Sequence, residues 1–240
     1  MPDEIFAHPT LAAIYDDLDG ERDDLDLYVA IVDELGARSV LDVGCGTGAL
    51  ACRLAQLGIS VTAVDPADAS LRIARHKPGA DGVRWILGDA TTVERVGVDL
   101  VTMTGNVAQV FLGDDWLATL RSVRGALTAG GHLVFETRDP AAVAWQSWTP
   151  ERSARTRPTS LGPVESWVQT TRIDPPFVTF RWTYRFLDDG QVLTSDSTLR
   201  FRDLDEIATS LDASGFAVDD VRDAPDRPGL EFVVVARAVR

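Results

Sequence analysis

The sequence has little of several features that mark particular classes of protein. It contains only two cysteines, Cys45 and Cys52, and their spacing fits neither a metal site nor a disulfide framework. No run approaches the roughly 20 consecutive apolar residues of a membrane-spanning helix. Residues 1–24 are acidic and lack the basic head and apolar run of a signal peptide. We therefore expect a cytoplasmic chain without a metal site or a membrane anchor.

Basic residues are also scarce. Lys and Arg number 23 against 37 Asp and Glu, which gives a net charge of −14, and Lys77 is the only lysine. Because phosphate binding requires a clustered basic surface, this charge argues against a nucleic-acid partner. It slightly favours a cationic or amine ligand over an anionic one. The 240 residues, 45% of them hydrophobic, are enough to bury the core of one domain.

Strand and helix patterns alternate through the first part of the chain. Short β-branched runs predict strands at residues 39–43, 61–64, 83–87, 100–104 and 132–136. Helical spacing of apolar residues between them predicts helices at residues 49–57, 69–76 and 116–127. Regular alternation with short connections is typical of a parallel sheet covered on both faces. We therefore predict an α/β fold with a Rossmann-like, doubly wound, seven-stranded sheet.

The pattern changes after the fifth predicted strand. Strand-like runs follow one another, and Asp189-Gly190 between the last two is a strong hairpin signal. These runs predict an antiparallel β insertion before the last helix, with strands at residues 164–173, 177–187 and 191–201. We expect residues 151–163 to form a flexible loop. The chain should end with a helix at residues 204–213, capped by Asp203, and a strand pair at 216–221 and 230–238.

A glycine-rich motif, VLDVGCGTG at residues 40–48, joins the first strand to the next helix. Its glycines permit a sharp turn that brings a ligand against bare backbone at a helix N-terminus. A dinucleotide site needs a similar turn, and Gly44, Gly46 and Ala49 satisfy the looser G-x-G-x-x-A fingerprint. Asp42 favours a different ligand, because its carboxylate would repel a pyrophosphate and attract the ammonium group of S-adenosylmethionine. The alternative is that Asp42 only caps a turn.

Two further carboxylates follow predicted strands, where ligands bind in sheets of this kind. Asp65 lies about 20 residues beyond the glycine turn, where an acidic side chain can accept hydrogen bonds from ribose hydroxyls. Its alternative role is the N-cap of the next helix. Asp89, in Gly88-Asp89-Ala90, is placed to accept from an adenine amino group.

These motifs, with VDP at 64–66 and DLVTMTGN at 99–106, resemble those of class I S-adenosylmethionine-dependent methyltransferases of the small-molecule type. The resemblance covers about residues 39–136 and implies S-adenosylmethionine as the cofactor. It places the glycines along the methionine moiety and implies that Met103, Thr104 and Asn106 line the floor near the reacting methyl group. Residues 12–16 resemble a lid helix in which Tyr15 closes over the cofactor. The implied cofactor-binding residues are Asp42, Gly44, Cys45, Gly46, Gly48, Asp65, Pro66, Asp89, Ala90, Met103, Thr104, Asn106 and Tyr15.

The resemblance also suggests how one domain, residues 1–240, is organised. We expect an N-terminal helical lid (1–38), a cofactor-binding core (39–137), a loop and β-meander insertion (138–202), and the last helix with the closing strand pair (203–240). Insertions of this kind build an acceptor pocket or a dimer contact in small-molecule enzymes, so a homodimer through the β insertion is possible.

Methyl transfer needs a general base only if the acceptor arrives protonated. The candidates are Glu136 at the end of the fifth strand, with Tyr15 and His8 in the lid segment. Glu136 is equally suited to pair with Arg138 or with a loop backbone. The insertion holds four tryptophans that could line an acceptor pocket or form the insertion's own core: Trp145, Trp148, Trp167 and Trp182.

We predict methyl transfer to an oxygen or nitrogen of a small molecule. A non-catalytic or regulatory protein that binds S-adenosylmethionine would share every cofactor motif. An NAD-dependent oxidoreductase is disfavoured by Asp42 and by the lack of a Tyr-x-x-x-Lys pair, because Ile73 stands four residues before Lys77.

Overall fold

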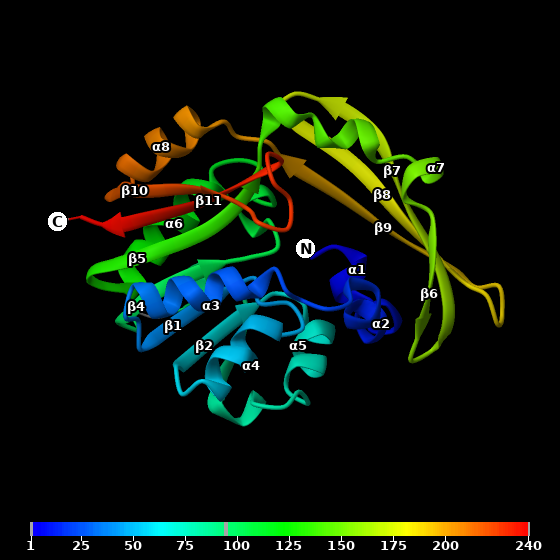
Figure 1. Cartoon of the computed structure of the whole chain (residues 1–240), viewed down its shortest axis with the longest axis horizontal. Coiled ribbons are helices and arrows are strands. Elements are labelled where there is room, and N and C mark those ends of the chain that lie inside the picture. Colours follow the sequence, from blue (N-terminus) through cyan, green and yellow to red (C-terminus); the bar gives the residue numbers. More distant parts are fainter. Residues whose placement is uncertain (1, 94–95, 240) are drawn as a thin grey trace.

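The computed structural model describes residues 2–93 and 96–239, and its larger part is built on a seven-stranded sheet (Figure 1). The strand order is β10-β11-β5-β4-β1-β2-β3. Strands β1 to β5 are parallel, and β11 and β10 continue the sheet antiparallel beyond β5. The strands span Ser39–Val43 (β1), Ser60–Asp65 (β2), Val83–Leu87 (β3), Val98–Met103 (β4), Leu127–Arg138 (β5), Phe216–Asp223 (β10) and Glu231–Ala238 (β11). The predicted fold class is confirmed.

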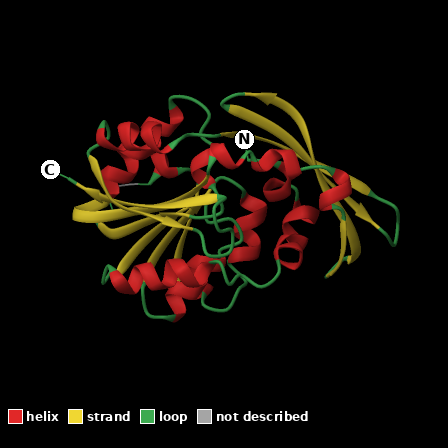
Figure 2. Ribbon diagram, turned by 45° about the horizontal axis from the view of Figure 1, so that its top comes forward, coloured by secondary structure: helices red, strands yellow, loops and turns green. Residues whose placement is uncertain are grey.

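Helices cover both faces of this sheet (Figure 2). Along β1, Val40 joins a buried cluster with α3 and α4, whereas Leu41 and Val43 join a cluster with α6 and α8. This alternation follows from the period of two in a strand, and it explains why β1 is apolar on both faces. The helices that cover the sheet are α3 (Leu25–Glu34), α4 (Ala49–Gln56), α5 (Asp68–Ala74), α6 (Asp115–Ala126) and α8 (Leu204–Asp212). As predicted, Asp203 caps α8 by accepting from the amide of Glu206.

Short one-turn elements complete the connections around the sheet. They are η1 (Ala80–Gly82), η2 (Ala90–Thr92), η3 (Val107–Gln109), η4 (Pro140–Ala142) and η5 (Ala144–Ser147). Strand β5 begins at Leu127, earlier than the predicted start at residue 132, and extends through the two glycines at 130–131. No helix of the described residues is both long and apolar enough to cross a membrane.

The insertion forms a separate antiparallel sheet in the order β6-β7-β8-β9. Its strands are β6 (Arg155–Thr159), β7 (Gly162–Asp174), β8 (Phe177–Phe186) and β9 (Val192–Arg200), preceded by the short helix α7 (Pro150–Ser153). The hairpin predicted between β8 and β9 is confirmed, with Gly190 at φ +74°.

The prediction of a flexible loop at residues 151–163 is wrong. Residues 155–159 form the edge strand β6 and pair with β7 from Gly162 to Ser166. The sequence RTRPT is polar and contains Pro158, and a proline argues against a central strand but is tolerated at an edge. Pairing with β7 and contact with α2 decide the conformation, and neither is visible in the local sequence.

Two N-terminal helices, α1 (Glu4–Ala7) and α2 (Pro9–Asp19), lie between the two sheets (Figure 1). Ile5, Leu11 and Ile14 form a buried cluster with side chains of β7 and β8. The amide of Ile5 also donates to Ser195 Oγ on β9 at 3.0 Å. Toward the larger sheet, Asp16 accepts from Thr47 Oγ1 at 2.7 Å and pairs with the single lysine, Lys77. The segment thus connects the insertion to the glycine turn, while the division into lid, core and insertion stays a prediction.

Candidate functional site

The glycine turn is shaped by close packing on one side and open space on the other. Gly44 and Gly48 have φ of +72° and +77°, a region that favours glycine. A Cβ atom on Gly44 would lie 2.5 Å from Val107, and one on Gly48 would lie 2.5 Å from Trp85. At Gly46, in contrast, nothing lies within 4 Å of the added carbon. The protein therefore requires Gly44 and Gly48 for its own packing, and Gly46 leaves bare backbone exposed to a ligand.

Asp42 is a buried carboxylate, 1% exposed, at the end of β1. Oδ1 accepts from Thr102 Oγ1 at 2.8 Å, but Oδ2 has no partner in the described structure. Burial raises the pKa of this carboxyl to about 6 from an ordinary 3.8. A buried acceptor without a donor is costly for the protein alone. Asp42 therefore has a spare acceptor for a cationic ligand and is not simply a turn cap.

Asp65 ties the glycine turn to the end of β2. One of its oxygens accepts from the amide of Gly46 and the other from the amide of Ala67, each at 2.8 Å. Burial raises the pKa of the Asp65 carboxyl. The Asp65 side chain therefore combines a local turn contact with a contact to the glycine turn, and its role toward a ribose stays a prediction.

The other predicted cofactor residues occupy different environments. Asp89 is exposed and accepts from the amide and hydroxyl of Thr91. Met103 is fully buried in the core, and Thr104 is half-buried just beyond β4. The remaining three predicted residues are Cys45, half-buried; Pro66, exposed; and Ala90, buried.

Asn106 is held in an unusual backbone conformation, with φ +61°. Its backbone amide donates to Glu136 Oε1 at 3.0 Å. Its side-chain Nδ2 lies 3.3 Å from both carboxylate oxygens of Glu231 and donates to them. Its Oδ1 is buried and has no donor in the part of the chain that the structure describes. Because Nδ2 faces a carboxylate, the orientation of the side-chain amide is fixed. Asn106 thus keeps one acceptor free.

Glu136 lies next to Asn106 and is 7% exposed. Besides the Asn106 amide, it accepts from the hydroxyl of Tyr28 on α3. Burial is the main cause that raises the pKa of Glu136. Of the two alternatives to a catalytic role, the structure shows contact with a loop backbone. Arg138 instead pairs with Glu231, with 3.3 Å between Nε and Oε1.

Three further residues lie at or beside the site and carry no sequence signal: Glu231, Tyr28 and Arg22. Glu231 opens β11 and reaches the site because that strand pairs antiparallel with β5, which places it opposite Arg138. Tyr28 is one apolar position of an amphipathic helix, and Arg22 is one of many charged residues in an acidic segment. No local pattern distinguishes these three from structural residues.

The two lid candidates differ in their placement. His8 caps α2, where its Nδ1 accepts from the amide of Thr10 at 3.2 Å. Tyr15 contacts Phe6, with ring centroids 5.4 Å apart, and lines a cavity. Burial raises the pKa of the Tyr15 phenol, so it is protonated at neutral pH.

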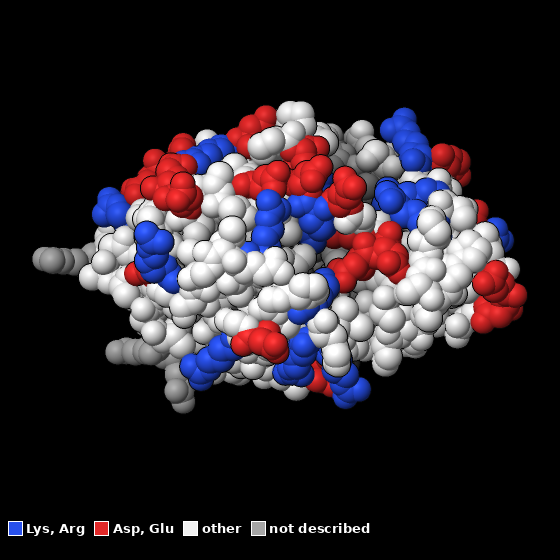
Figure 3. All heavy atoms as spheres, turned by 60° about the horizontal axis from the view of Figure 1, so that its bottom comes forward, with Lys and Arg blue, Asp and Glu red and all other residues white. Residues whose placement is uncertain are grey.

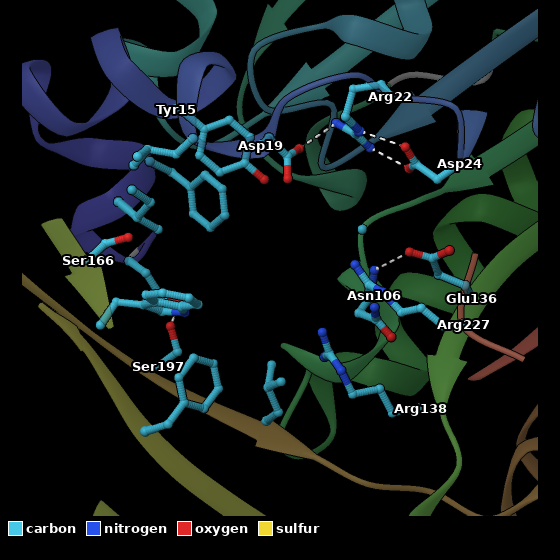
Figure 4. A pocket seen from close by; sticks show the side chains of 18 of the residues that line it. Tyr15, Asp19, Arg22, Asp24, Asn106, Glu136, Arg138, Ser166, Ser197 and Arg227 are labelled. Atoms are coloured by element: carbon cyan, nitrogen blue, oxygen red, sulfur yellow. Dashed lines mark hydrogen bonds and ion pairs between the residues drawn. The ribbon is translucent and has the colours of Figure 1, made fainter. Parts of the chain in front are cut away.

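A cavity of about 520 Å³ separates the larger sheet from the insertion (Figure 4). Tyr15, Asp19, Arg22 and Asp24 of the N-terminal segment lie along one side of it, and Ser166 and Ser197 come from the insertion. Asn106, Glu136, Arg138 and Arg227 lie across from the insertion. The loop containing Gly105 and Asn106 also reaches the glycine turn, since Val107 packs on Gly44. The cavity therefore adjoins the predicted cofactor site.

The sequence allowed two roles for the tryptophans, the core of the insertion or the lining of an acceptor pocket, and the structure shows both. Trp145 and Trp148 pack edge-on against Phe201 and Phe180, with centroids 4.6 and 4.8 Å apart, and belong to the insertion's own core. Trp182 lines the cavity. The cavity is thus not filled by tryptophan side chains.

Comparisons with known proteins agree with this geometry. Residues 40–131 match the family described as "Methyltransferase domain". An uncharacterized methyltransferase of Mycobacterium tuberculosis strain H37Rv is 36% identical over 113 residues, which are 46% of this chain and 57% of that protein. The chain thus spans little more than half the length of this relative.

Two solved structures share the fold over almost the whole chain. A S-adenosylmethionine-dependent methyltransferase from Clostridium acetobutylicum has a TM-score of 0.77 at 16% identity, covering 93% of this chain and 94% of that one. The amino pentose methyltransferase CalS10 from Micromonospora echinaspora, solved with S-adenosylmethionine bound, has a TM-score of 0.69 at 24% identity and covers 91% and 92%. The resemblance found in the sequence is confirmed: residues 40–131 match a methyltransferase domain, and the chain shares the fold of S-adenosylmethionine-dependent methyltransferases of known structure.

Proposed function

We propose that this protein transfers a methyl group from S-adenosylmethionine to an oxygen or nitrogen of a small molecule. The observation that carries the proposal is the buried Asp42 carboxylate, whose unpartnered Oδ2 lies beside the open glycine turn. The family match and the S-adenosylmethionine-bound structural neighbour support the same cofactor.

The residues around the glycine turn fit this cofactor in charge and in space. Asp42 offers a carboxylate to an ammonium group, and the free side of Gly46 lets a ligand approach the backbone. Asp65 and Asp89 would serve the ribose and the adenine, and Met103, Thr104 and Asn106 would form the floor. When bound, the cofactor supplies an electrophilic methyl group on a sulfonium, which needs no further activation.

The chain's own contribution is then to position the acceptor and to exclude water. The cavity beside Asn106 would hold the acceptor next to the cofactor site, and alignment alone accounts for a large share of the rate enhancement in such reactions. Glu136, Tyr15 and His8 are the proposed groups for moving a proton, and only the first two line the cavity. His8 is engaged as a helix cap, which favours Glu136.

The alternative of a non-catalytic binding protein predicts a filled pocket next to the cofactor. The open cavity beside Asn106 favours catalysis. An NAD-dependent oxidoreductase is disfavoured by Asp42 at the position where a pyrophosphate would bind. A homodimer through the β insertion stays a prediction, which light scattering in solution tests.

Calorimetric titration with S-adenosylhomocysteine and with NADH tests the cofactor class. We expect binding of the first and none of the second, and binding of NADH alone would refute the role of Asp42. Asp65→Asn should weaken S-adenosylhomocysteine binding by about tenfold or more. Asn is a better test than Ala, because Asn keeps an acceptor for one of the two amides of Gly46 and Ala67, whereas Ala would free both. The matched control is Asp81→Asn, which removes one charge at an exposed position in η1; equal affinities of the two variants would contradict the ribose assignment.

A further inference from the structure

The charges around the cavity are unbalanced. Of the described side chains that line it, seven are acidic and four are arginines. Figure 3 shows basic and acidic side chains interspersed on one face of the protein, and the whole chain also carries more Asp and Glu (37) than Lys and Arg (23). A cavity with this excess attracts cations and repels carboxylates and phosphates.

Three of the four arginines are already engaged with protein carboxylates. Arg22 pairs with Asp19 at 3.0 Å and Asp24 at 2.8 Å. Arg138 and Arg227 both pair with Glu231, at 3.3 and 2.7 Å. The fourth, Arg155, lies over the ring of Trp182, 5.8 Å from its centroid. The three paired arginines therefore offer little positive charge to a ligand.

Unlike the carboxylates that pair with these arginines, Glu136 has no described basic side chain within 4.0 Å of its carboxylate. Its two hydrogen-bond donors, the Tyr28 hydroxyl and the Asn106 amide, are both neutral. Burial raises its pKa, so Glu136 can take up a proton more readily than an exposed carboxylate. A positively charged group nearby would relieve the cost of burying this charge.

A second observation at the same place points to a ligand. Asn106 is 3% exposed, it lines the cavity, and its Oδ1 has no donor among the described residues. An acceptor of this kind requires an N–H or O–H group. Across the cavity the insertion presents an aromatic wall in which Trp182 stacks with Tyr184, with centroids 6.1 Å apart. One end of the cavity thus suits a hydrogen-bonding cation, and the opposite wall suits a ring.

We propose that the methyl acceptor is a primary or secondary amine on a small ring-bearing molecule, with its nitrogen at Asn106 and Glu136 and its ring toward Trp182. This inference rests on the proposed methyl transfer. The bound ammonium gives one proton to Glu136, and its freed lone pair forms the new N–CH₃ bond as the S–CH₃ bond breaks. The methylated nitrogen is then positively charged, and Glu136 returns its proton to solvent as the product leaves.

Binding of matched ring compounds tests the inference independently of activity. Benzylamine, benzyl alcohol and benzoate, and the corresponding cyclohexyl compounds, are titrated into the protein with and without S-adenosylhomocysteine. We expect the amines to bind at least about tenfold more tightly than the alcohols and carboxylates, which corresponds to about 1.4 kcal/mol. Alcohols or carboxylates that bind as tightly as the amines, or amines that do not bind at all, would overturn the inference.

Variants separate the charge of Glu136 from its structural contacts. Glu136→Gln keeps an acceptor for the Asn106 backbone amide and can donate to the Tyr28 hydroxyl oxygen, but it should remove the amine preference. Asp212→Asn, an equal charge change on the exposed end of α8, should keep that preference. If Glu136→Gln does not fold, Asp23→Asn at the rim should reduce the preference by a smaller factor. An unchanged preference in the folded variant would refute the role of Glu136. Failure of S-adenosylhomocysteine to bind, with the amine preference intact, would instead refute the proposed methyl transfer.

Discussion

Replacing Asp42 by Asn should make the free energy of unfolding less dependent on pH and should lower the affinity for the cofactor. The folded-state pKa of about 6 lies above the ordinary value of 3.8. The charged carboxylate therefore destabilises the ligand-free protein, and the effect grows as pH rises through 6. At about 1.36 kcal/mol for each tenfold change in proton affinity, the full effect is about 3 kcal/mol, of which about 1.3 kcal/mol develops between pH 5 and 7.

Asn introduces an opposing cost that does not depend on pH. Its Oδ1 can still accept from Thr102, but its Nδ2 replaces an oxygen that has no partner, and a buried unpaired donor costs about 1–3 kcal/mol. The effect of the charge is therefore measured by how the difference in stability between variant and wild type changes with pH. The absolute value of that difference also contains the cost of the unpaired donor.

Urea denaturation of the ligand-free proteins at pH 5, 6 and 7 measures this slope. The free energy of unfolding of Asp42→Asn relative to wild type should rise by about 1.3 kcal/mol over this range. Thr102→Val is the control: it removes the donor that lowers the pKa of Asp42 and retains the carboxylate, so its stability should fall between pH 5 and 7 at least as steeply as that of wild type. S-adenosylhomocysteine affinity of Asp42→Asn should fall by at least about tenfold. A flat difference between pH 5 and 7, or an unchanged affinity, would refute the reasoning.

Two paired substitutions test the glycine turn and the insertion. Gly48→Ala should destabilise the protein by about 2 kcal/mol or more, through a clash with Trp85 and a positive φ, as thermal denaturation would show. Gly46→Ala has open space and should cost only about 1–2 kcal/mol, yet it should abolish cofactor binding; retained binding would contradict the assignment of the open face. Trp148→Ala should lower stability by about 2–3 kcal/mol because it removes insertion core. Trp182→Ala should weaken the binding of ring-bearing acceptors and cause a smaller loss of stability than Trp148→Ala. Equal losses of stability in the two variants would argue against Trp182 as a wall of the pocket.

The larger sheet could be predicted because its information is local. β-branched runs such as residues 39–43 predict strands wherever they occur, and the glycine turn at 44–48 needs positive φ whatever surrounds it. The positions of Asp42, Asp65 and Asp89 at strand ends followed from the same alternation. The strand bounds of β1 and β3 agree with the prediction at both ends, since each strand is short and bounded by turn residues.

Strand β6 could not be predicted from its local sequence. Its polar sequence has little strand propensity, and it is ordered by pairing with β7 and by contact with α2. The same applies to the charged side of the cavity. Glu231 and Glu136 lie 95 residues apart in the chain, and only the antiparallel pairing of β11 with β5 brings them to one place.

The sequence by itself therefore determined the alternation of strands and helices in the larger sheet and the glycine turn, and it indicated the class of cofactor, because each depends on residues that are close in the chain. Only the tertiary structure decided which carboxylates are neutralised and which are free. Arg138 on β5 is engaged by Glu231 on β11, whereas Glu136 has only neutral donors and Asn106 Oδ1 has no donor among the described residues, and these differences depend on distances between segments far apart in the chain.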